Sequence, residues 1–286
     1  MQDGAKNTLK ACMVPEPLIQ IQGLYKIFGQ APNLILPLVR EGQTKEKLLV
    51  ESDHTIGLDD INLDIGYGEV FVLMGLSGSG KSTLIRTLNR LIEPTAGSIH
   101  IGGTNVLTLD QRALEKFRRQ KLSMVFQSFA LLPHRTVLDN VGFGLSIRKI
   151  AKDERYAKAQ SWIEKVGLKG YENQFPAQLS GGQQQRVGLA RALCTNPQIL
   201  LMDEAFSALD PLIRSEMQQQ LIDLQKDLKK TVVFITHDLE EALRIGNRIA
   251  ILNDGRISQV GTPKEILENP ADDYVTAFVR DVKRAF

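Results

Sequence analysis

The order of hydrophobic and polar residues predicts strands that alternate with helices. Residues 18–28 (LIQIQGLYKIF) alternate and then run apolar, which predicts an outer strand. Residues 58–65 (LDDINLDI) and 69–75 (EVFVLMG) predict two more strands, and the apolar run of the second predicts burial in a parallel sheet. Residues 31–57 contain prolines and a charge cluster, which indicates a partly helical insertion. We expect a ligand at the carboxyl end of the buried strand.

Later segments continue this alternation. The residues after Lys81 follow the spacing of one helical face, and we expect Glu93-Pro94 to end that helix. Its apolar positions are Leu84, Ile85, Leu88, Leu91 and Ile92. Further strands are expected at 122–127 (LSMVFQ), 198–204 (QILLMDE), 231–238 (TVVFITHD) and 248–257 (RIAILNDGRI). This order predicts an α/β fold with an open, mostly parallel sheet covered by helices.

The segment 128–191 differs from the rest because it contains amphipathic pieces and no convincing strand. We interpret it as a helical subdomain inserted between strands of the sheet. The predicted organisation is therefore a tail at 1–17 and one domain at 18–286. Within that domain, residues 18–127 and 192–286 form the core around the helical subdomain.

Composition narrows the class of protein. With 286 residues, 43% hydrophobic and 24% charged, the chain suits one large α/β domain or two small ones. Its 35 basic and 33 acidic residues give a net charge of +2, so we expect no nucleic-acid partner. No segment resembles a signal peptide or approaches the ~18 apolar residues of a membrane span. Cys12 and Cys194 lack CxxC or Cys/His neighbours, which favours a reducing cytosol over a disulfide framework or metal site.

A glycine-rich segment after the buried strand matches GxxxxGK[ST], the pattern of a phosphate-binding loop. Its glycines allow backbone N–H groups to converge on phosphates at the N-terminus of the next helix. We expect Lys81 to place its charge at the β- and γ-phosphates of ATP, and Ser82 to offer its hydroxyl to Mg²⁺. The predicted nucleotide-binding residues are Gly75, Leu76, Ser77, Gly78, Ser79, Gly80, Lys81, Ser82 and Thr83. One such loop without an internal repeat excludes a tandem ATPase.

Polar residues at the ends of other predicted strands complete a candidate catalytic set with Lys81. We assign Asp203 to the Mg²⁺ shell and Glu204 to the attacking water. Neighbouring strand residues point to opposite faces, so we do not expect the two acids to share one role. Gln127 is a candidate to contact Mg²⁺ or the attacking water through its amide oxygen. The alternative is that it is a surface glutamine without this role. His237 either donates to the γ-phosphate or is a strand-end histidine without that task. No chemistry is assigned to His54, His100 and His134.

A second glycine-rich helix start lies at residues 179–183 (LSGGQ). We expect Ser180 to cap the helix that continues from Gln183, while Gly181 and Gly182 leave the backbone bare for an anion. Because the phosphate loop already completes one nucleotide pocket, we predict a homodimer in which two copies dock head to tail. Each LSGGQ then closes over the γ-phosphate held by the other copy.

In this order, GLSGSGKST, Gln127, LSGGQ, ILLMDE, SALD at 207–210 and His237 resemble the nucleotide-binding subunit of an ATP-binding cassette (ABC) transporter. The resemblance covers nearly the whole chain and implies a P-loop NTPase core with an antiparallel β edge. It also implies that Phe28 stacks on adenine and that Asp210 communicates across the dimer. The stretch after Gln127 resembles the groove that receives a coupling helix from a membrane permease.

A narrower resemblance is to importers of glycine betaine, proline and choline. It is carried by LYKIFG with its long insertion, LNRLIEPTAG, VFQSFALLPH, LLMDEAFSALDPLIR and NPADDYV, and by Ala205, where most importers have proline. It implies integral membrane permease subunits and an extracytoplasmic substrate-binding protein as partners, and a peripheral position on the cytoplasmic face of the inner membrane. Many members continue into a pair of regulatory nucleotide-sensing domains, which we do not expect in a chain ending at Phe286.

Two other functions stay open on the residues alone. A non-transport cassette ATPase is disfavoured because chains of that kind usually carry two cassettes or a long coiled-coil insertion. A small-molecule kinase built on the phosphate loop has no evident need of LSGGQ. Co-purification with an integral membrane subunit discriminates among these classes. The residues do not specify whether betaine, choline, proline or histidine is transported.

Overall fold

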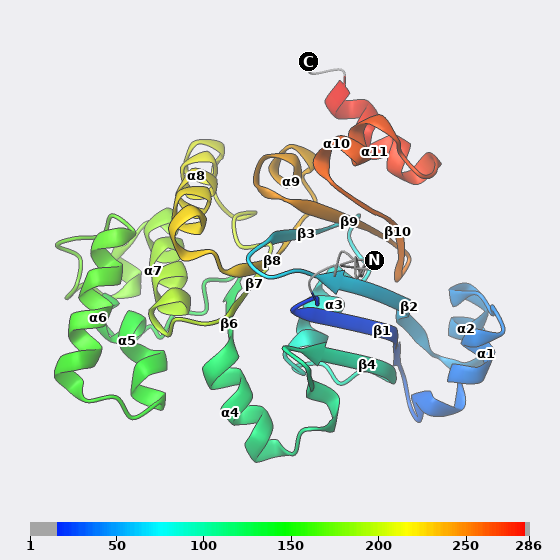
Figure 1. The fold of residues 1–286 in the computed structure, drawn as a ribbon, viewed down its shortest axis with the longest axis horizontal. Helices are drawn as coiled ribbons and strands as arrows, with labels where there is room; N and C mark the ends of the chain where they lie inside the picture. Colours follow the sequence, from blue (N-terminus) through cyan, green and yellow to red (C-terminus); the bar gives the residue numbers. More distant parts are fainter. Residues whose placement is uncertain (1–15, 284–286) are drawn as a thin grey trace, which may run out of the picture.

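A six-stranded sheet in the order β10-β9-β3-β8-β7-β6 forms the centre of the protein (Figure 1). The computed structural model describes residues 16–283, so Cys12 and most of the predicted tail lie outside the described residues. The strands are β3 (Val70–Met74), β6 (Leu122–Phe126), β7 (Ile199–Asp203), β8 (Thr231–Thr236), β9 (Arg248–Asn253) and β10 (Arg256–Gly261). All pairs are parallel except β10 with β9. Every residue of β3, β7 and β8 is buried, in agreement with their apolar runs.

A second, antiparallel sheet lies beside the first in the order β2-β1-β4-β5. Its strands are β1 (Ile19–Phe28), β2 (Thr55–Ile65), β4 (Ala96–Ile101) and β5 (Thr104–Asn105). The antiparallel strands thus form a sheet of their own, where we expected only an edge. The single strand expected at 248–257 was also wrong, because this segment is the hairpin β9-β10. Asp254 and Gly255 turn the chain with φ of 48° and 83°.

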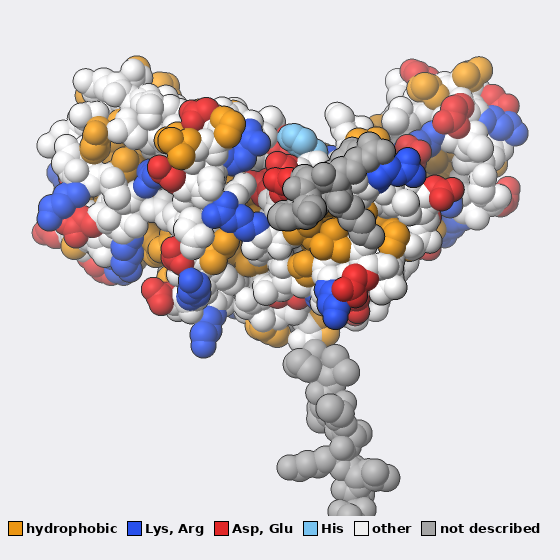
Figure 2. Space-filling model, turned by 90° about the horizontal axis from the view of Figure 1, so that it is seen from above, with side chains coloured by type: hydrophobic (Ala, Val, Ile, Leu, Met, Phe, Trp, Pro, Cys, Tyr) orange, Lys and Arg blue, Asp and Glu red, His pale blue; other side chains and the backbone are white. Residues whose placement is uncertain are grey.

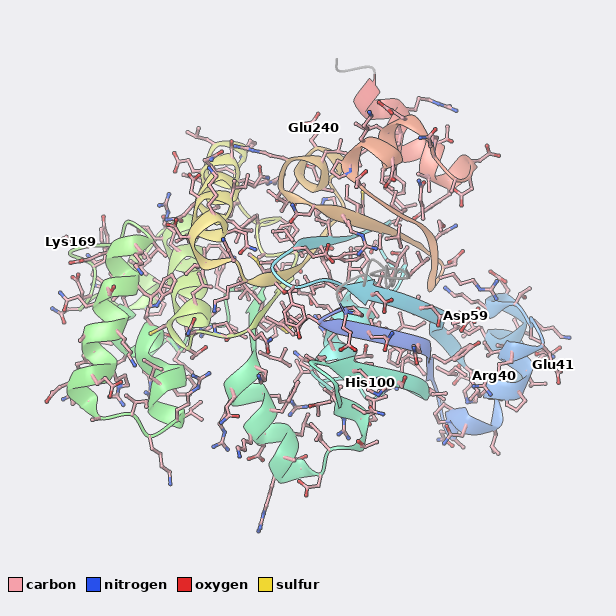
Figure 3. All side chains as sticks on the ribbon, viewed as in Figure 1. Arg40, Glu41, Asp59, His100, Lys169 and Glu240 are labelled. Carbon is pink, nitrogen blue, oxygen red and sulfur yellow. The ribbon has the colours of Figure 1, made fainter. Side chains whose placement is uncertain are left out.

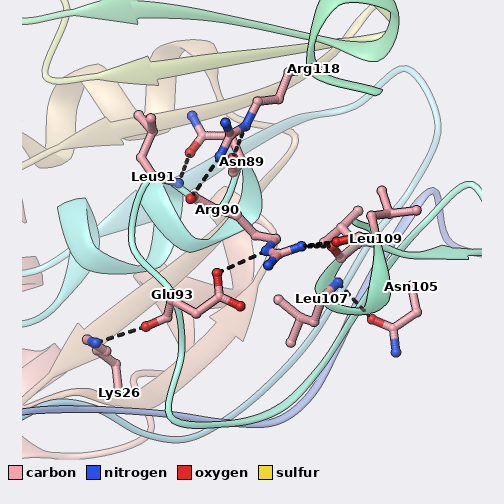
Figure 4. Close-up of polar contacts among 10 residues, drawn as sticks. Lys26, Asn89, Arg90, Leu91, Glu93, Asn105, Leu107, Leu109 and Arg118 are labelled. Carbon is pink, nitrogen blue, oxygen red and sulfur yellow. Dashed lines mark hydrogen bonds and ion pairs between the residues drawn. The ribbon is translucent and has the colours of Figure 1, made fainter. Parts of the chain in front are cut away.

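The helix after the phosphate loop is shorter than its apolar spacing predicts. α3 spans Lys81–Leu88, and Leu91 is exposed instead of lying on the helix face. Arg90 takes a left-handed φ of 52°. The Arg118 side chain donates to the carbonyl oxygens of Asn89 and Arg90 at 2.7 and 2.9 Å (Figure 4). These bonds hold the chain in a turn, so the helix cannot continue to the proline as we expected.

Three helices make up the helical subdomain, on the left of Figure 1. They are α5 (Val137–Ile147), α6 (Lys152–Lys165) and α7 (Gly181–Cys194), with the 3₁₀ turn η3 (Pro176–Gln178) before α7. Val141, Ile163 and Val187 lie in a core of their own. Because α7 continues to Cys194, our expected boundary at residue 191 falls inside a helix.

Burial raises the pKa of the Cys194 thiol to about 11.

The insertion between β1 and β2 is partly helical, as its pattern predicts. It contains η1 (Pro32–Leu34), α1 (Leu36–Arg40) and α2 (Lys45–Ser52), and Arg40 marks it at the right of Figure 3. The remaining helical segments are η2 (Val106–Thr108), α4 (Gln111–Lys121), α8 (Pro211–Leu228), α9 (Leu239–Ile245), α10 (Pro263–Glu268) and α11 (Asp273–Lys283). Among residues 16–283, no helix combines the length and apolar character needed to cross a bilayer.

The central sheet packs on both faces, and β3 shows how its residues divide. Val72 and Met74 belong to a core with residues of α7, α8, α9 and α11. Phe71 and Leu73 belong to a second core with α3 and the antiparallel sheet. On the face seen in Figure 2, acidic and basic side chains are interspersed around a notch between two lobes. Because β3 is packed on both faces, its carboxyl end, where the phosphate loop begins, is held in place.

Candidate active site

The phosphate loop joins the carboxyl end of β3 to the start of α3. Gly80 is the N-cap of α3, and within residues 16–283 no side chain accepts a hydrogen bond from the first-turn N–H groups. A helix start without a side-chain cap presents free donors at the positive end of its dipole. The Ser79 hydroxyl is buried and lacks a partner within the described part of the chain. The loop therefore fits a phosphate group.

Lys81 is buried beneath the same loop, and among the described residues its ammonium group binds two carbonyl oxygens. Its Nζ donates to Gly75 O at 2.9 Å and to Leu76 O at 2.8 Å. Burial lowers the pKa of Lys81, while Glu204 and Asp203 oppose that shift. A desolvated cation beside free backbone donors makes the loop attractive to an anion.

Asp203 ends β7 and connects two side chains of α3. Ser82 Oγ donates to Asp203 Oδ1 at 2.9 Å, and Arg86 Nη2 lies 2.9 Å from Asp203 Oδ2. Hard oxygen donors of this kind fit Mg²⁺. No group of three or more His, Cys, Asp or Glu side chains suited to a metal occurs in residues 16–283, so the other ligands would come from phosphate, water or an amide oxygen such as that of Gln127. Sequence reasoning missed Arg86, although its position one turn after Ser82 was a usable signal.

Glu204 does not continue the strand as we expected. β7 ends at Asp203, and Glu204 takes a left-handed φ of 47°. Its direction therefore comes from a turn and not from strand alternation. Glu204 Oε2 lies 4.0 Å from His237 Nδ1, and 59% of the His237 side chain is exposed. The structure thus brings together the ends of β7 and β8, with a carboxylate and an imidazole beside open space.

Gln127 lies directly after β6 and is exposed. Its Nε2 donates to Ser207 Oγ at 3.2 Å, and Ser207 Oγ in turn donates to Glu204 O at 2.9 Å. Gln127 is thereby linked to the turn that contains Glu204. Asp210 is exposed at the N-cap of α8, where its side chain makes no capping bond.

The second glycine-rich segment forms a capping box. Ser180 Oγ accepts from Gln183 N at 3.3 Å, and Gln183 Oε1 accepts from Ser180 N at 2.9 Å. The expected cap is confirmed. A Cβ on Gly182 would lie 2.6 Å from Ile213 Cγ2, so glycine here permits close approach to α8. Within residues 16–283, no hydrogen bond or ion pair joins this segment to the phosphate loop.

Phe28 ends β1 with an exposed ring, 40% accessible. Lys26 Nζ lies 4.9 Å from the ring centroid and donates to Glu93 O at 2.8 Å (Figure 4). His54 lies at the end of the insertion that follows Phe28. It is buried, and its ring contacts the carbonyl oxygens of Ser52 and Gln30. The ring keeps an exposed surface beside the Lys26 ammonium group, and the buried histidine links the two ends of the insertion.

Arg191 in α7 holds the segment after Gln127, and sequence reasoning missed it. Phe129 and Ala130 take left-handed φ values of 57° and 47°. Arg191 donates to their carbonyl oxygens at 2.9 and 2.7 Å. Burial lowers the pKa of this guanidinium. Two strained residues are thus fixed by the helix that begins with LSGGQ.

The sequence of this chain is similar to that of known proteins. The family model described as ABC transporter matches residues 58–207. The chain is 54% identical over 264 residues to the glycine betaine transport ATP-binding protein OpuAA of Bacillus subtilis, covering 92% of this chain and 63% of that protein. It is equally 54% identical over 264 residues to the glycine betaine/proline betaine transport system ATP-binding protein ProV of Salmonella typhimurium, covering 92% and 66%. The chain thus spans less than two thirds of the length of these relatives.

A solved structure shares the fold. The ATP-binding cassette MJ0796, described as a dimer in a post-hydrolysis state bound to ADP and Pi, gives a TM-score of 0.73 at 34% identity. The match covers 86% of this chain and 98% of that chain. The matches agree with the structure, which has a phosphate loop at the carboxyl end of a parallel strand and a helical subdomain that contains LSGGQ. The chain belongs to the ABC transporter family.

Proposed function

We propose that this chain binds and hydrolyses ATP as the nucleotide-binding subunit of an importer. The observation that carries the proposal is the α3 start, free of a side-chain cap, beside the Ser82–Asp203 pair at 2.9 Å. Free backbone donors, a buried ammonium group and oxygen ligands at one sheet edge suit a nucleoside triphosphate with Mg²⁺. The ADP and Pi in the description of MJ0796 support the same reaction.

Each catalytic residue has its own task in this proposal. Lys81 exchanges its carbonyl partners for phosphate oxygens and neutralises their charge. Ser82 and Asp203 hold Mg²⁺, which supplies further positive charge at the phosphates. Glu204 orients the attacking water and accepts its proton, while His237, 4.0 Å away, donates to the γ-phosphate.

Three other residues act at the margin of the proposed site. The exposed ring of Phe28 stacks on adenine. Gln127 uses its amide nitrogen for Ser207, which leaves the amide oxygen for Mg²⁺ or the water. Asp210, exposed at the start of α8, contacts the other copy across the dimer.

We infer that two copies form the working unit. The proposal is supported by the LSGGQ segment, which makes no bond to its own phosphate loop in the described residues and is supplied by a second copy in this arrangement. Docked head to tail, residues 180–183 of each copy contact the γ-phosphate held by the other, and ATP links the pair. The dimeric description of MJ0796 supports this arrangement.

The importer assigned by this proposal takes up glycine betaine, proline, choline or a related amine. The descriptions of OpuAA and ProV support this substrate class. The partners are integral membrane permease subunits and an extracytoplasmic substrate-binding protein. The chain then sits peripherally on the cytoplasmic face of the membrane, where dimer closure changes the opening of the permease.

The test is the Glu204→Gln variant. It should bind ATP as the wild type does and form an ATP-dependent dimer, yet hydrolyse ATP at least about 100-fold more slowly, because the water loses its base. Fluorescent nucleotide titration, size exclusion with ATP and phosphate release measure these three properties. Glu240→Gln is the matched control, since Glu240 is an exposed carboxylate on the nearby helix α9 (Figure 3). Undiminished hydrolysis by Glu204→Gln would contradict the proposed role.

A further inference from the structure

The last described helix, α11, contacts the phosphate loop through one hydroxyl group. Tyr274 Oη accepts from Leu76 N at 3.2 Å and donates to Leu252 O at 3.2 Å. The ring of Tyr274 packs edge-on against Phe278, with centroids 5.1 Å apart. Val275, on the same helix, is fully buried in the core beneath the sheet. The hydroxyl is therefore carried by an anchored helix.

The two backbone segments that this hydroxyl binds also approach each other closely. Gly75 takes a φ of 147°, and a Cβ there would lie only 2.2 Å from Leu252 O. The end of β9 thus touches the first residue of the phosphate loop. Tyr274 links the next residue, Leu76, to the same carbonyl group. Strand β9, the loop and α11 meet at one point.

Lys81 holds Gly75 and Leu76 through their carbonyl oxygens. Its ammonium group donates to Gly75 O and Leu76 O at 2.9 and 2.8 Å. A phosphate that recruits this ammonium group removes it from these carbonyl oxygens. In the described residues, Tyr274 is then the side chain that still binds the Gly75-Leu76 segment, alongside the backbone turn from Ser79 N to Leu76 O.

α11 also borders the opposite side of the site. A cavity of about 600 Å³ separates α11 from the start of α9, and its lining includes Leu76, His237, Leu239, Tyr274 and Phe278. The helix therefore adjoins both the loop proposed to bind the phosphates and the histidine proposed to contact the γ-phosphate. The Tyr274 hydroxyl connects α11 to this loop.

We propose that Tyr274 is a positioning residue for nucleotide binding, which keeps the start of the phosphate loop in place when Lys81 turns to the phosphates. The inference rests on the proposed binding of ATP by this loop. It links the position of α11 to nucleotide affinity, and by linkage nucleotide binding stabilises α11 in this position. The hydroxyl touches no reacting atom, so it acts on affinity and leaves the chemical step unchanged.

Tyr274→Phe tests the proposal because it removes the hydroxyl and keeps the ring on Phe278. Loss of one neutral hydrogen bond should raise the KM and Kd for ATP about fivefold, with kcat at saturation unchanged within about twofold. The Leu76 amide should exchange its hydrogen faster, as followed by NMR in the nucleotide-free protein. Tyr156→Phe is the matched control, since Tyr156 donates to Asp139 in the helical subdomain at 2.7 Å. It should leave all three quantities unchanged.

The outcomes separate this inference from the proposed function. If the wild type binds ATP and Tyr274→Phe has the same affinity and the same Leu76 exchange, Tyr274 does not position the loop. A lower kcat at unchanged KM would equally overturn the inference. If the wild type fails to bind ATP, the proposed function fails, while Leu76 exchange still decides whether the hydroxyl holds the loop.

Discussion

The two glycine-rich helix starts of this protein look alike in sequence and differ in structure. At α3, the N-cap is Gly80, and no side chain in the described part of the chain satisfies the first-turn amides. At α7, Ser180 and Gln183 satisfy each other's backbone N–H groups. The first start is ready for an anion within one chain. The second is self-capped, so an incoming phosphate has to compete with the capping box.

Charge separates the two starts further. Lys81 supplies a buried ammonium group at the first turn of α3. The first turn of α7 contains only glycine and glutamine, and the first basic residue along the helix, Arg186, is already paired with Glu216 at 3.0 Å. In the two-copy proposal, the first start therefore provides the affinity for a triphosphate, and the second completes the site that holds it. This division of roles underlies the two-copy proposal.

The largest effect is expected from Lys81→Met, which removes the charge of the first start. ATP hydrolysis should fall about 1,000-fold, since a desolvated cation at the phosphates is lost. Stability at neutral pH should be retained or raised, because methionine suffers no desolvation of a charge. Phosphate release and thermal unfolding measure the two effects. Normal turnover in this variant would contradict the proposed difference between the two helix starts.

The same variant has a pH signature. Burial lowers the folded-state pKa of Lys81 below its unfolded value of 10.5, so the unfolded chain binds this proton more tightly. The resulting penalty is present at neutral pH and disappears as the pH rises through the folded pKa toward 10.5. Any stability advantage of Lys81→Met should therefore shrink in alkaline buffer, as measured by urea unfolding between pH 7 and 10. An advantage that grows with pH would contradict this sign.

The second start should respond differently to Ser180→Arg. Turnover should fall about 100-fold, because a bulky side chain blocks the contact with the other copy's phosphate. ATP affinity should stay within about threefold of the wild type, since the phosphate loop is intact. Nucleotide titration and phosphate release on one preparation check both. Lost affinity with normal turnover would place LSGGQ in the pocket of its own chain.

A smaller effect is expected where LSGGQ meets α8. Gly182→Ala puts a Cβ 2.6 Å from Ile213 Cγ2 and should lower the free energy of unfolding by about 2 kcal/mol. Gly181→Ala is the matched control, because its nearest neighbour, Phe129 Cζ, would be 3.9 Å away. Adding Ile213→Ala to Gly182→Ala should remove the clash in a double-mutant cycle. Equal stability of the two glycine variants would contradict the close approach.

The smallest effect is expected from the cap itself. Ser180→Ala removes one partner of the box and should lower the free energy of unfolding by about 1 kcal/mol. Thr136→Ala at the start of α5 provides the control, since Thr136 Oγ1 accepts from Asp139 N in the same way. Urea unfolding of both variants should give similar losses. A Ser180→Ala variant as stable as the wild type would show that the box does not stabilise α7.

Much of the site follows from local pattern, because its parts lie at the ends of apolar strands. The phosphate loop after β3 and the acid at the end of β7 were predictable for that reason. The turn at Glu204 was not, since it depends on a left-handed φ that no pattern marks. Strand alternation alone also could not separate two sheets, because partner choice is set by packing.

Residues that bind a segment distant in the sequence could not be predicted either, because such contacts are set by packing. Arg191 binds carbonyl oxygens more than sixty residues away, and Tyr274 binds Leu76 at a separation of 198 residues. Both bonds use backbone groups of the partner segment, which leave no trace in its side chains. Arg118, which ends α3 early, acts in the same way. Sequence patterns predict elements and motifs, whereas these ties require coordinates.

The most direct test of the two-copy claim mixes two inactive variants. Lys81→Met retains LSGGQ, and Ser180→Arg retains the phosphate loop, so a mixed pair contains one intact site. Equimolar mixing should restore about a quarter of the wild-type hydrolysis rate, because half of the pairs are mixed and each has one working site of two. A mixture that stays as inactive as its components, at concentrations where the wild type is fully active, would contradict the claim.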